Sequence, residues 1–133
     1  MDPQTAARLQ VVSEEYQKLQ GDLSNTVEAR QKLDAQLGEN ELVKKEFDQL
    51  TPNDVVYKQV GPVLVKQDQA DAKNNVQTRL EFIKSEIKRV ETQLQDIQNK
   101  SNSKKNELVE IQAAFQQAQQ AASPNTTAPA ITA

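Results

Sequence analysis

Carboxylate pairs come closest to a catalytic pattern in this sequence. Glu14 and Glu15 are adjacent, and Glu107 and Glu110 are spaced for one helical face. Paired carboxylates of this kind can serve as general acid and base. Both pairs fall where outer, solvated faces of helices are predicted, and paired charge is ordinary on such faces. We interpret them as surface charge and expect no enzymatic activity.

The composition excludes most other kinds of catalytic and metal-binding site. The chain contains no Cys and no His. It therefore lacks disulfides, thiolate nucleophiles, the commonest zinc ligand and the usual general base. The sequence also carries no Gly-rich phosphate loop and no metal-ligand cluster. We expect no catalytic residue, no cofactor and no metal.

The charge balance argues against nucleic acid as a partner. The chain has 16 Lys and Arg against 19 Asp and Glu, a formal charge of -3, whereas proteins that wrap phosphate backbones carry basic surfaces. No apolar run is long enough to span a bilayer, and the first residues show no basic flank before an apolar core. We therefore expect a cytoplasmic protein without membrane or nucleic-acid partners.

A long helix is predicted before the middle of the chain. Asp2 is a suitable N-cap before Pro3, and the clash that Pro52 imposes on Thr51 should end the helix near Leu50. Apolar residues spaced alternately by three and four form a heptad seam. They are Leu9, Val12, Tyr16, Leu19, Leu23, Leu33, Leu37 and Phe47.

A second long helix follows, with Asp68 as its N-cap and polar breaks at Ser101 and Lys104. Its seam consists of Val76, Leu80, Ile83, Ile87, Val90, Leu94, Ile97, Leu108, Ile111, Phe115 and Ala118. The pattern stops after Ala122, and residues 123–133, which are rich in Pro, Thr and Ala, are predicted to be a disordered tail.

The two helices are expected to pair. Neither is expected to be stable alone, and a short connection makes them antiparallel, so residues 1–122 are predicted to form a coiled-coil arm of roughly 70 Å. We align residues whose numbers sum to about 130, which places Arg30 near Ser101 and Thr26 near Lys104. In this register the start of the second helix, including Val76, overhangs and packs beside the connection.

The connection carries the strongest strand signal in the chain. Residues 55–65 are dense in β-branched and aromatic side chains around Gly61 and Pro62, which suit a type II′ turn. The fold class is therefore mainly α, a long antiparallel two-helix coiled coil with one β-hairpin at the helix–helix connection. Such a hairpin is marginal alone, and valines on both faces would need cover.

Two roles for the hairpin remain open at this point. Its unpaired strand edges can template pairing with another chain. Alternatively, it is a hydrophobic cap that only closes the helical pair. A structural coiled-coil adaptor or tether would explain both seams but gives the hairpin no task.

Three stretches resemble the β class of prefoldin subunits, especially its eukaryotic members. They are residues 31–47 before the hairpin, residues 55–67 of the hairpin, and residues 79–89 of the second helix. A single hairpin, rather than two, is typical of the β class. The resemblance covers roughly residues 9–120.

The resemblance implies a subunit of a hetero-hexameric co-chaperone, assembled with other prefoldin subunits of the α and β classes. In that family the hairpins build a β-barrel platform, and the distal ends of the arms hold unfolded clients, including nascent actin and tubulin. The clients pass to the cytosolic chaperonin without ATP use by prefoldin.

Two sets of site residues follow from the resemblance and the pattern. The subunit-assembly residues would be Val55, Val56, Tyr57, Val60, Gly61, Val63, Leu64 and Val65. The client-contact residues would lie at the arm's far end, where helix ends fray beyond the polar layer and expose an apolar strip. They are Leu9, Val12, Tyr16, Leu108, Ile111 and Phe115.

Overall fold

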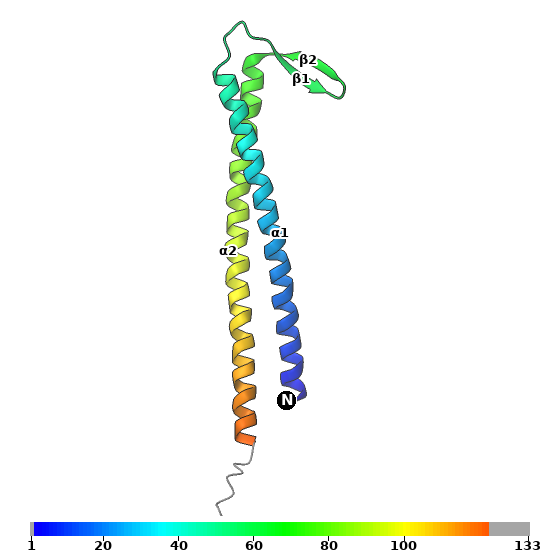
Figure 1. Ribbon diagram of the computed structural model, residues 1–133, viewed down its shortest axis with the longest axis vertical. Coiled ribbons are helices and arrows are strands. Elements are labelled where there is room, and N and C mark those ends of the chain that lie inside the picture. Colours follow the sequence, from blue (N-terminus) through cyan, green and yellow to red (C-terminus); the bar gives the residue numbers. More distant parts are fainter. Residues whose placement is uncertain (1, 123–133) are drawn as a thin grey trace, which may run out of the picture. The chain divides into compact units, whose positions relative to one another are not determined.

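The computed structural model describes residues 2–122 and confirms the predicted fold class. In chain order the elements are α1 (Pro3–Asp48), β1 (Val56–Val60), β2 (Val63–Gln67) and α2 (Gln69–Ala122) (Figure 1). The predicted tail at 123–133 lies outside the described residues.

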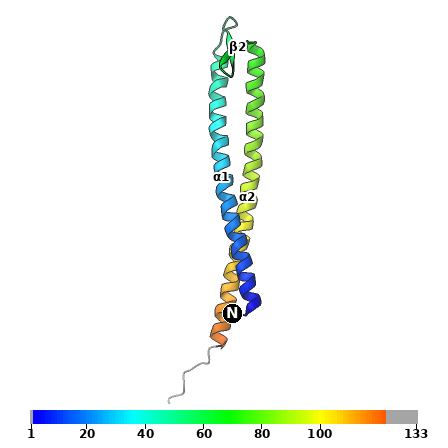
Figure 2. The same ribbon diagram turned by 90° about the vertical axis from the view of Figure 1, so that its right-hand side faces the viewer.

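Both helices pass through two compact units. The central unit, residues 25–95, holds the second half of α1, the hairpin and the first half of α2. The terminal unit consists of residues 2–24 and 96–122. Within the central unit the helices run side by side in opposite directions, with the hairpin at their connected ends (Figures 1 and 2).

Side chains cap both helix starts as predicted. The backbone N–H of Thr5 donates to Oδ1 of Asp2 at 2.7 Å, and that of Asp71 donates to Oδ2 of Asp68 at 3.2 Å. These bonds satisfy backbone donors that have no partner inside the helix. The bond from the Thr5 backbone also lowers the pKa of the Asp2 carboxyl. Both predicted N-caps are confirmed.

The end of α1 lies slightly before the predicted position. The helix ends at Asp48 rather than near Leu50. The N–H of Leu50 instead reaches the carbonyl of Phe47 at 3.2 Å, a tightened last turn. Thr51 then donates its N–H to Oδ2 of Asp54 at 2.7 Å, which fixes the loop before the hairpin.

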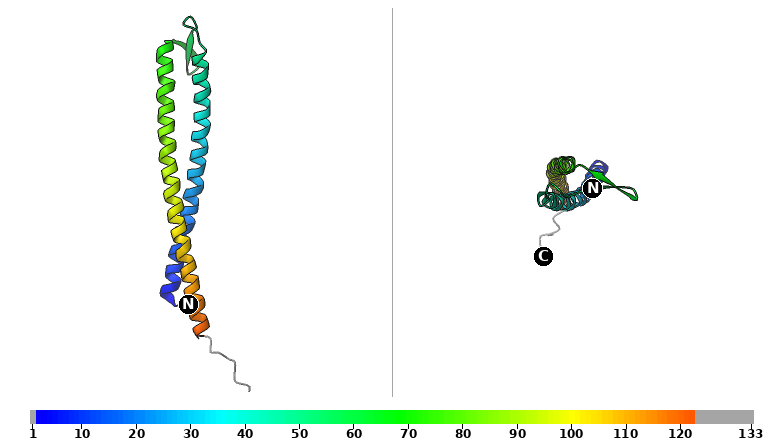
Figure 3. Two further views of the ribbon diagram at one scale, coloured as in Figure 1. Left: turned by 90° about the vertical axis from the view of Figure 1, so that its left-hand side faces the viewer. Right: turned by 90° about the horizontal axis from the view of Figure 1, so that it is seen from above.

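The hairpin turns at Gly61 and Pro62. Gly61 has φ 58°, a conformation that L side chains rarely adopt, and Pro62 fits the negative φ that follows, as in a type II′ turn. Val60 pairs with Val63 across this turn, and Val56 pairs with Gln67 at the open end. Viewed from above, the hairpin projects away from the ends of the two helices (Figure 3).

Seam residues form the core of each unit. Leu80, Ile83 and Val90 are buried in the central unit, and Val12 and Ile111 are buried in the terminal unit. All five were predicted from the heptad pattern, and α2 contributes most of them. Apolar burial of these seam side chains, most of them on α2, therefore stabilises each unit.

The predicted helix register is wrong by about ten residues. Polar contacts join Arg30 to Glu91, Gln20 to Ser101 and Glu15 to Lys104, so facing residues have numbers that sum to about 120. The prediction assumed that polar seam residues face one another. Arg30 and Lys104 instead reach carboxylates of the other helix, and the buried hydroxyl of Ser101 receives a hydrogen bond from Gln20.

The predicted overhang of α2 is also wrong. Val76 lies against the last turns of α1, where it lines a cavity of about 210 Å³ together with Lys44 and Phe47. The side chain of Gln69 at the start of α2 donates to the carbonyl of Thr51 at 3.1 Å. The end of α1 therefore lies beside the first turns of α2, and the predicted long overhang is absent.

Replacing both helical glycines with alanine is expected to stabilise the helices. A Cβ at Gly21 or Gly38 would meet no atom within 4 Å, and each change should add about 1 kcal/mol from helix propensity. Thermal unfolding followed by circular dichroism should show a higher midpoint. Gly61→Ala is the matched control: it should strain only the turn and leave helix melting unchanged. A lower midpoint for the helical double variant would contradict the expectation.

Candidate assembly and client-contact site

The hairpin has one strongly apolar face. Residues directly opposite in an antiparallel pair share a face, and residues alternate along each strand. Val56, Val60, Val63 and Val65 therefore lie together on a surface that we call the valine face, beside Lys58 and Gln67. The prediction that valines occupy both faces is wrong for the strands. Because the turn has two residues, the strand register places all four valines on the same face of the hairpin.

The opposite face is mixed. It carries Tyr57 and Leu64 as diagonal neighbours, each opposite a polar side chain, Lys66 and Gln59 respectively. Tyr57 is 58% and Leu64 is 65% exposed. This face is therefore partly apolar, and its two large apolar side chains are mostly exposed.

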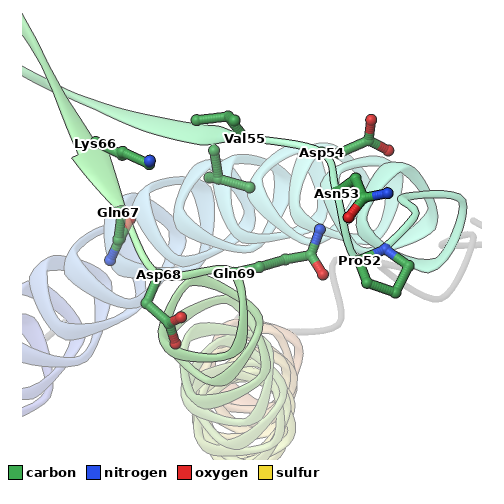
Figure 4. A pocket seen from close by; sticks show the side chains of 9 residues that line it. Pro52, Asn53, Asp54, Val55, Lys66, Gln67, Asp68 and Gln69 are labelled. Atoms are coloured by element: carbon green, nitrogen blue, oxygen red, sulfur yellow. The ribbon is translucent and has the colours of Figure 1, made fainter.

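The hairpin joins the helices beside an open cavity. This cavity has a volume of about 510 Å³ and lies between the segment that enters β1 and the segment that leaves β2 (Figure 4). Val55 and Val56 supply apolar wall, while Asp54, Lys66 and Asp68 supply charge. The cavity lies at the base of the hairpin, next to the start of α2.

All eight predicted assembly residues lie on the hairpin or immediately before it. Val55 precedes β1 and is half exposed, and Gly61 occupies the turn. The structure therefore brings this set together as one protruding element. Both edges of the two-stranded sheet are unpaired within the described residues.

The six predicted client-contact residues all lie in the terminal unit. Val12 and Ile111 are buried, and the other four are half-buried. They line the seam of this unit rather than its surface. Contact with a client through them requires the seam to open.

Sequence reasoning missed two outward-facing valines in the same unit. Val11 and Val109 are 52% and 57% exposed. Each adjoins a seam residue but lies off the heptad positions, so the periodicity gave no reason to single it out. The signal that could have identified them was the presence of an apolar side chain at a position outside the heptad seam.

A polar layer interrupts the seam of the terminal unit. Ser101 is buried, and its hydroxyl accepts a hydrogen bond of 2.7 Å from Nε2 of Gln20. Nζ of Lys104 lies 2.6 Å from Glu15 and 3.7 Å from Glu107. The hydrogen bond to Glu15 raises the pKa of Lys104. The prediction that Arg30 and Ser101 share one polar level is wrong, because Arg30 meets Glu91 in the central unit whereas Ser101 meets Gln20 in the terminal unit.

The two carboxylate pairs lie on the two helices of the terminal unit. One member of each pair, Glu15 and Glu107, is engaged by Lys104 in an exposed ion pair. Within residues 2–122, no three potential ligand side chains gather to hold a metal ion. None of the described helices carries a stretch long and apolar enough to cross a membrane.

Comparisons with known proteins agree with this architecture. The family model of the prefoldin subunit matches residues 10–121. The chain is 47% identical over 117 residues to prefoldin subunit 6 of Mus musculus, which covers 88% of this chain and 92% of the relative. It is 46% identical over 99 residues to prefoldin subunit 6 of Arabidopsis thaliana, covering 74% and 77% of the two chains.

A solved structure shows the same fold. The prefoldin beta subunit from Thermococcus strain KS-1 superposes with a TM-score of 0.71 at 25% identity, over 85% of this chain and 93% of that one. The resemblance to the β class that the sequence suggested is therefore confirmed. Since the family model spans most of the sequence and the relatives come from animals and plants alike, this chain belongs to the prefoldin family of chaperone subunits.

Proposed function

We propose that this chain is one subunit of a hetero-hexameric, ATP-independent holdase in the cytoplasm. The complex binds unfolded proteins such as nascent actin and tubulin and transfers them to the cytosolic chaperonin. The chain itself has no enzymatic activity and takes no cofactor. One observation carries the proposal: a protruding hairpin whose faces are apolar and whose edges are unpaired.

The exposed hairpin supports assembly through strand addition. A two-stranded hairpin is marginal in water without a covering layer. Val60, Val63 and Val65 are each about half exposed, and full burial of one such side chain stabilises by roughly 1.5 to 3 kcal/mol. Pairing with hairpins of other prefoldin subunits would cover the valine face and satisfy both edges at once.

The terminal unit supports client holding. Its seam is narrow and carries the polar layer at Gln20 and Ser101, and helix ends open at low free-energy cost. Opening would expose the six seam residues as an apolar strip able to contact many unfolded chains. A tether without clients would leave the exposed hairpin valines without a role.

Reconstitution tests this function. The chain, mixed with the other subunits of its prefoldin complex, should give a hexamer by light scattering, and that hexamer should suppress aggregation of denatured actin without ATP. Added chaperonin should then receive the actin, whereas a mixture lacking this chain should do neither. A stable lone monomer that never joins its partners would overturn the assembly, and a hexamer that leaves aggregation unchanged would overturn the holdase.

A further inference from the structure

Two consecutive seam positions of the terminal unit carry polar residues. Along α2, the apolar seam residues Ile97 and Leu108 bracket Ser101 and Lys104, with the spacing of three and four that seam positions share. Ser101 is 6% exposed, and the Lys104 side chain is 30% exposed. Both positions therefore bury less apolar surface than leucine would bury there, which lowers the stability of the closed seam at this level.

Both polar residues have partners on α1. The hydroxyl of Ser101 accepts a hydrogen bond of 2.7 Å from Nε2 of Gln20, and Nζ of Lys104 lies 2.6 Å from Oε2 of Glu15. We call the pair of Lys104 and Glu15 the ionic latch. Because the Glu15 side chain is 45% exposed, water and salt reach the pair, and salt weakens exposed ion pairs. The ionic latch thus joins the two helices through a contact that depends on ionic strength.

The ionic latch lies within the predicted client strip. Partner numbers fall along α1 as they rise along α2, from Gln20 with Ser101 to Glu15 with Lys104. Residues before 15 and after 104 therefore lie on the same side of the latch, toward the helix ends. Five of the six predicted client-contact residues lie there: Leu9, Val12, Leu108, Ile111 and Phe115. The sixth, Tyr16, lies one residue further inward than Glu15, so opening that exposes the whole strip must break the latch.

We propose that the ionic latch controls how often the client strip opens. The contact with Glu15 closes the seam, while the polar residues at 101 and 104 keep the closed seam unstable enough to open. The proposal rests on the proposed holding of clients by this seam and adds the contact that regulates it. Two changes to the same ion pair should therefore act in opposite directions, according to whether they leave a polar or an apolar side chain in the seam.

Distances between spin labels in the reconstituted hexamer test the latch without any client. Because the chain has no Cys, Arg8→Cys with Gln112→Cys allows two labels to be attached to this subunit before mixing, at exposed positions of the two helices. Glu15→Gln should raise the population with widely separated labels by about twofold to fivefold, the effect of losing one exposed ion pair. It should also abolish the increase that high salt produces in the unchanged chain. Glu14→Gln, the matched control, should alter neither quantity.

Lys104→Leu removes the same ion pair but should close the seam. The leucine adds apolar burial at a seam position and leaves no ammonium to desolvate, so the separated population should fall at least about twofold. Suppression of actin aggregation should weaken with it. Lys105→Leu makes the same change at the neighbouring exposed position and should leave both measurements unchanged.

The two readouts separate the latch from the proposed function. Opening of the seam by Lys104→Leu, or an unchanged label distribution in Glu15→Gln, would overturn the latch. Label populations that shift as expected, in complexes that all suppress actin aggregation equally, would instead overturn the holding of clients by this seam.

Discussion

Replacing Val63 with lysine is expected to keep this chain out of the hexamer. Val63 lies on the valine face opposite Val60 and is 56% exposed in the single chain. The proposed assembly through this face would bury it, so the variant should lose about 1.5 to 2 kcal/mol of apolar burial and must also desolvate an ammonium. Together these terms should weaken incorporation by more than about 100-fold. Light scattering of reconstituted mixtures measures this incorporation into the hexamer.

A lysine on the other face is the matched control. Gln59 lies in the middle of β1 opposite Leu64, so Gln59→Lys adds the same charge to the same hairpin without entering the valine face. It should assemble at close to the wild-type concentration. Neither variant should change the helical circular dichroism, because the hairpin contributes nothing to the seams. Normal assembly of Val63→Lys would refute the valine face as the buried surface.

The elements of the fold could be predicted because their signals are local. Asp2 and Asp68 cap helices through their own neighbours, and Gly61 with Pro62 sets the turn without help from the rest of the chain. The heptad spacing likewise identified Leu80 as core. Each of these residues acts within a few positions of itself, so the sequence alone was sufficient.

The register could not be predicted, because its polar determinants act across the helix pair. Arg30 and Ser101 are both seam interruptions, and matching one with the other was reasonable by pattern. In the structure Arg30 reaches Glu91 and Ser101 receives Gln20. Gln20 and Glu91 are ordinary exposed residues in sequence. Nothing in their spacing distinguishes them from the many other charged and amide side chains of these helices.

The outward apolar residues were missed for a related reason. A heptad assignment sorts residues into seam and surface, and Leu42 and Phe82 count as surface. Only the exposed area in the folded chain shows that they remain uncovered.

Changing the terminal seam is expected to remove client holding and to leave the hexamer intact. The variant combines Leu9→Ser, Val12→Ser and Phe115→Ser in the terminal unit, whereas the proposed assembly uses the hairpin of the central unit. Each serine deletes apolar surface that an unfolded client would cover once the seam opens, worth on the order of 1.5 to 3 kcal/mol per side chain. If this arm carries a major share of binding, suppression of actin aggregation should need at least about tenfold more complex.

The exposed valines of the same unit separate seam contact from surface contact. Val11→Ser with Val109→Ser makes the same kind of chemical change on side chains that are already about half exposed. It should preserve suppression to within about twofold, because these residues contribute no seam packing and the proposed client strip lies inside the seam. Loss of suppression in this pair alone would move client contact from the seam to the outer surface. Full suppression by the seam variant, in a hexamer of normal mass, would refute the six seam residues as the client site.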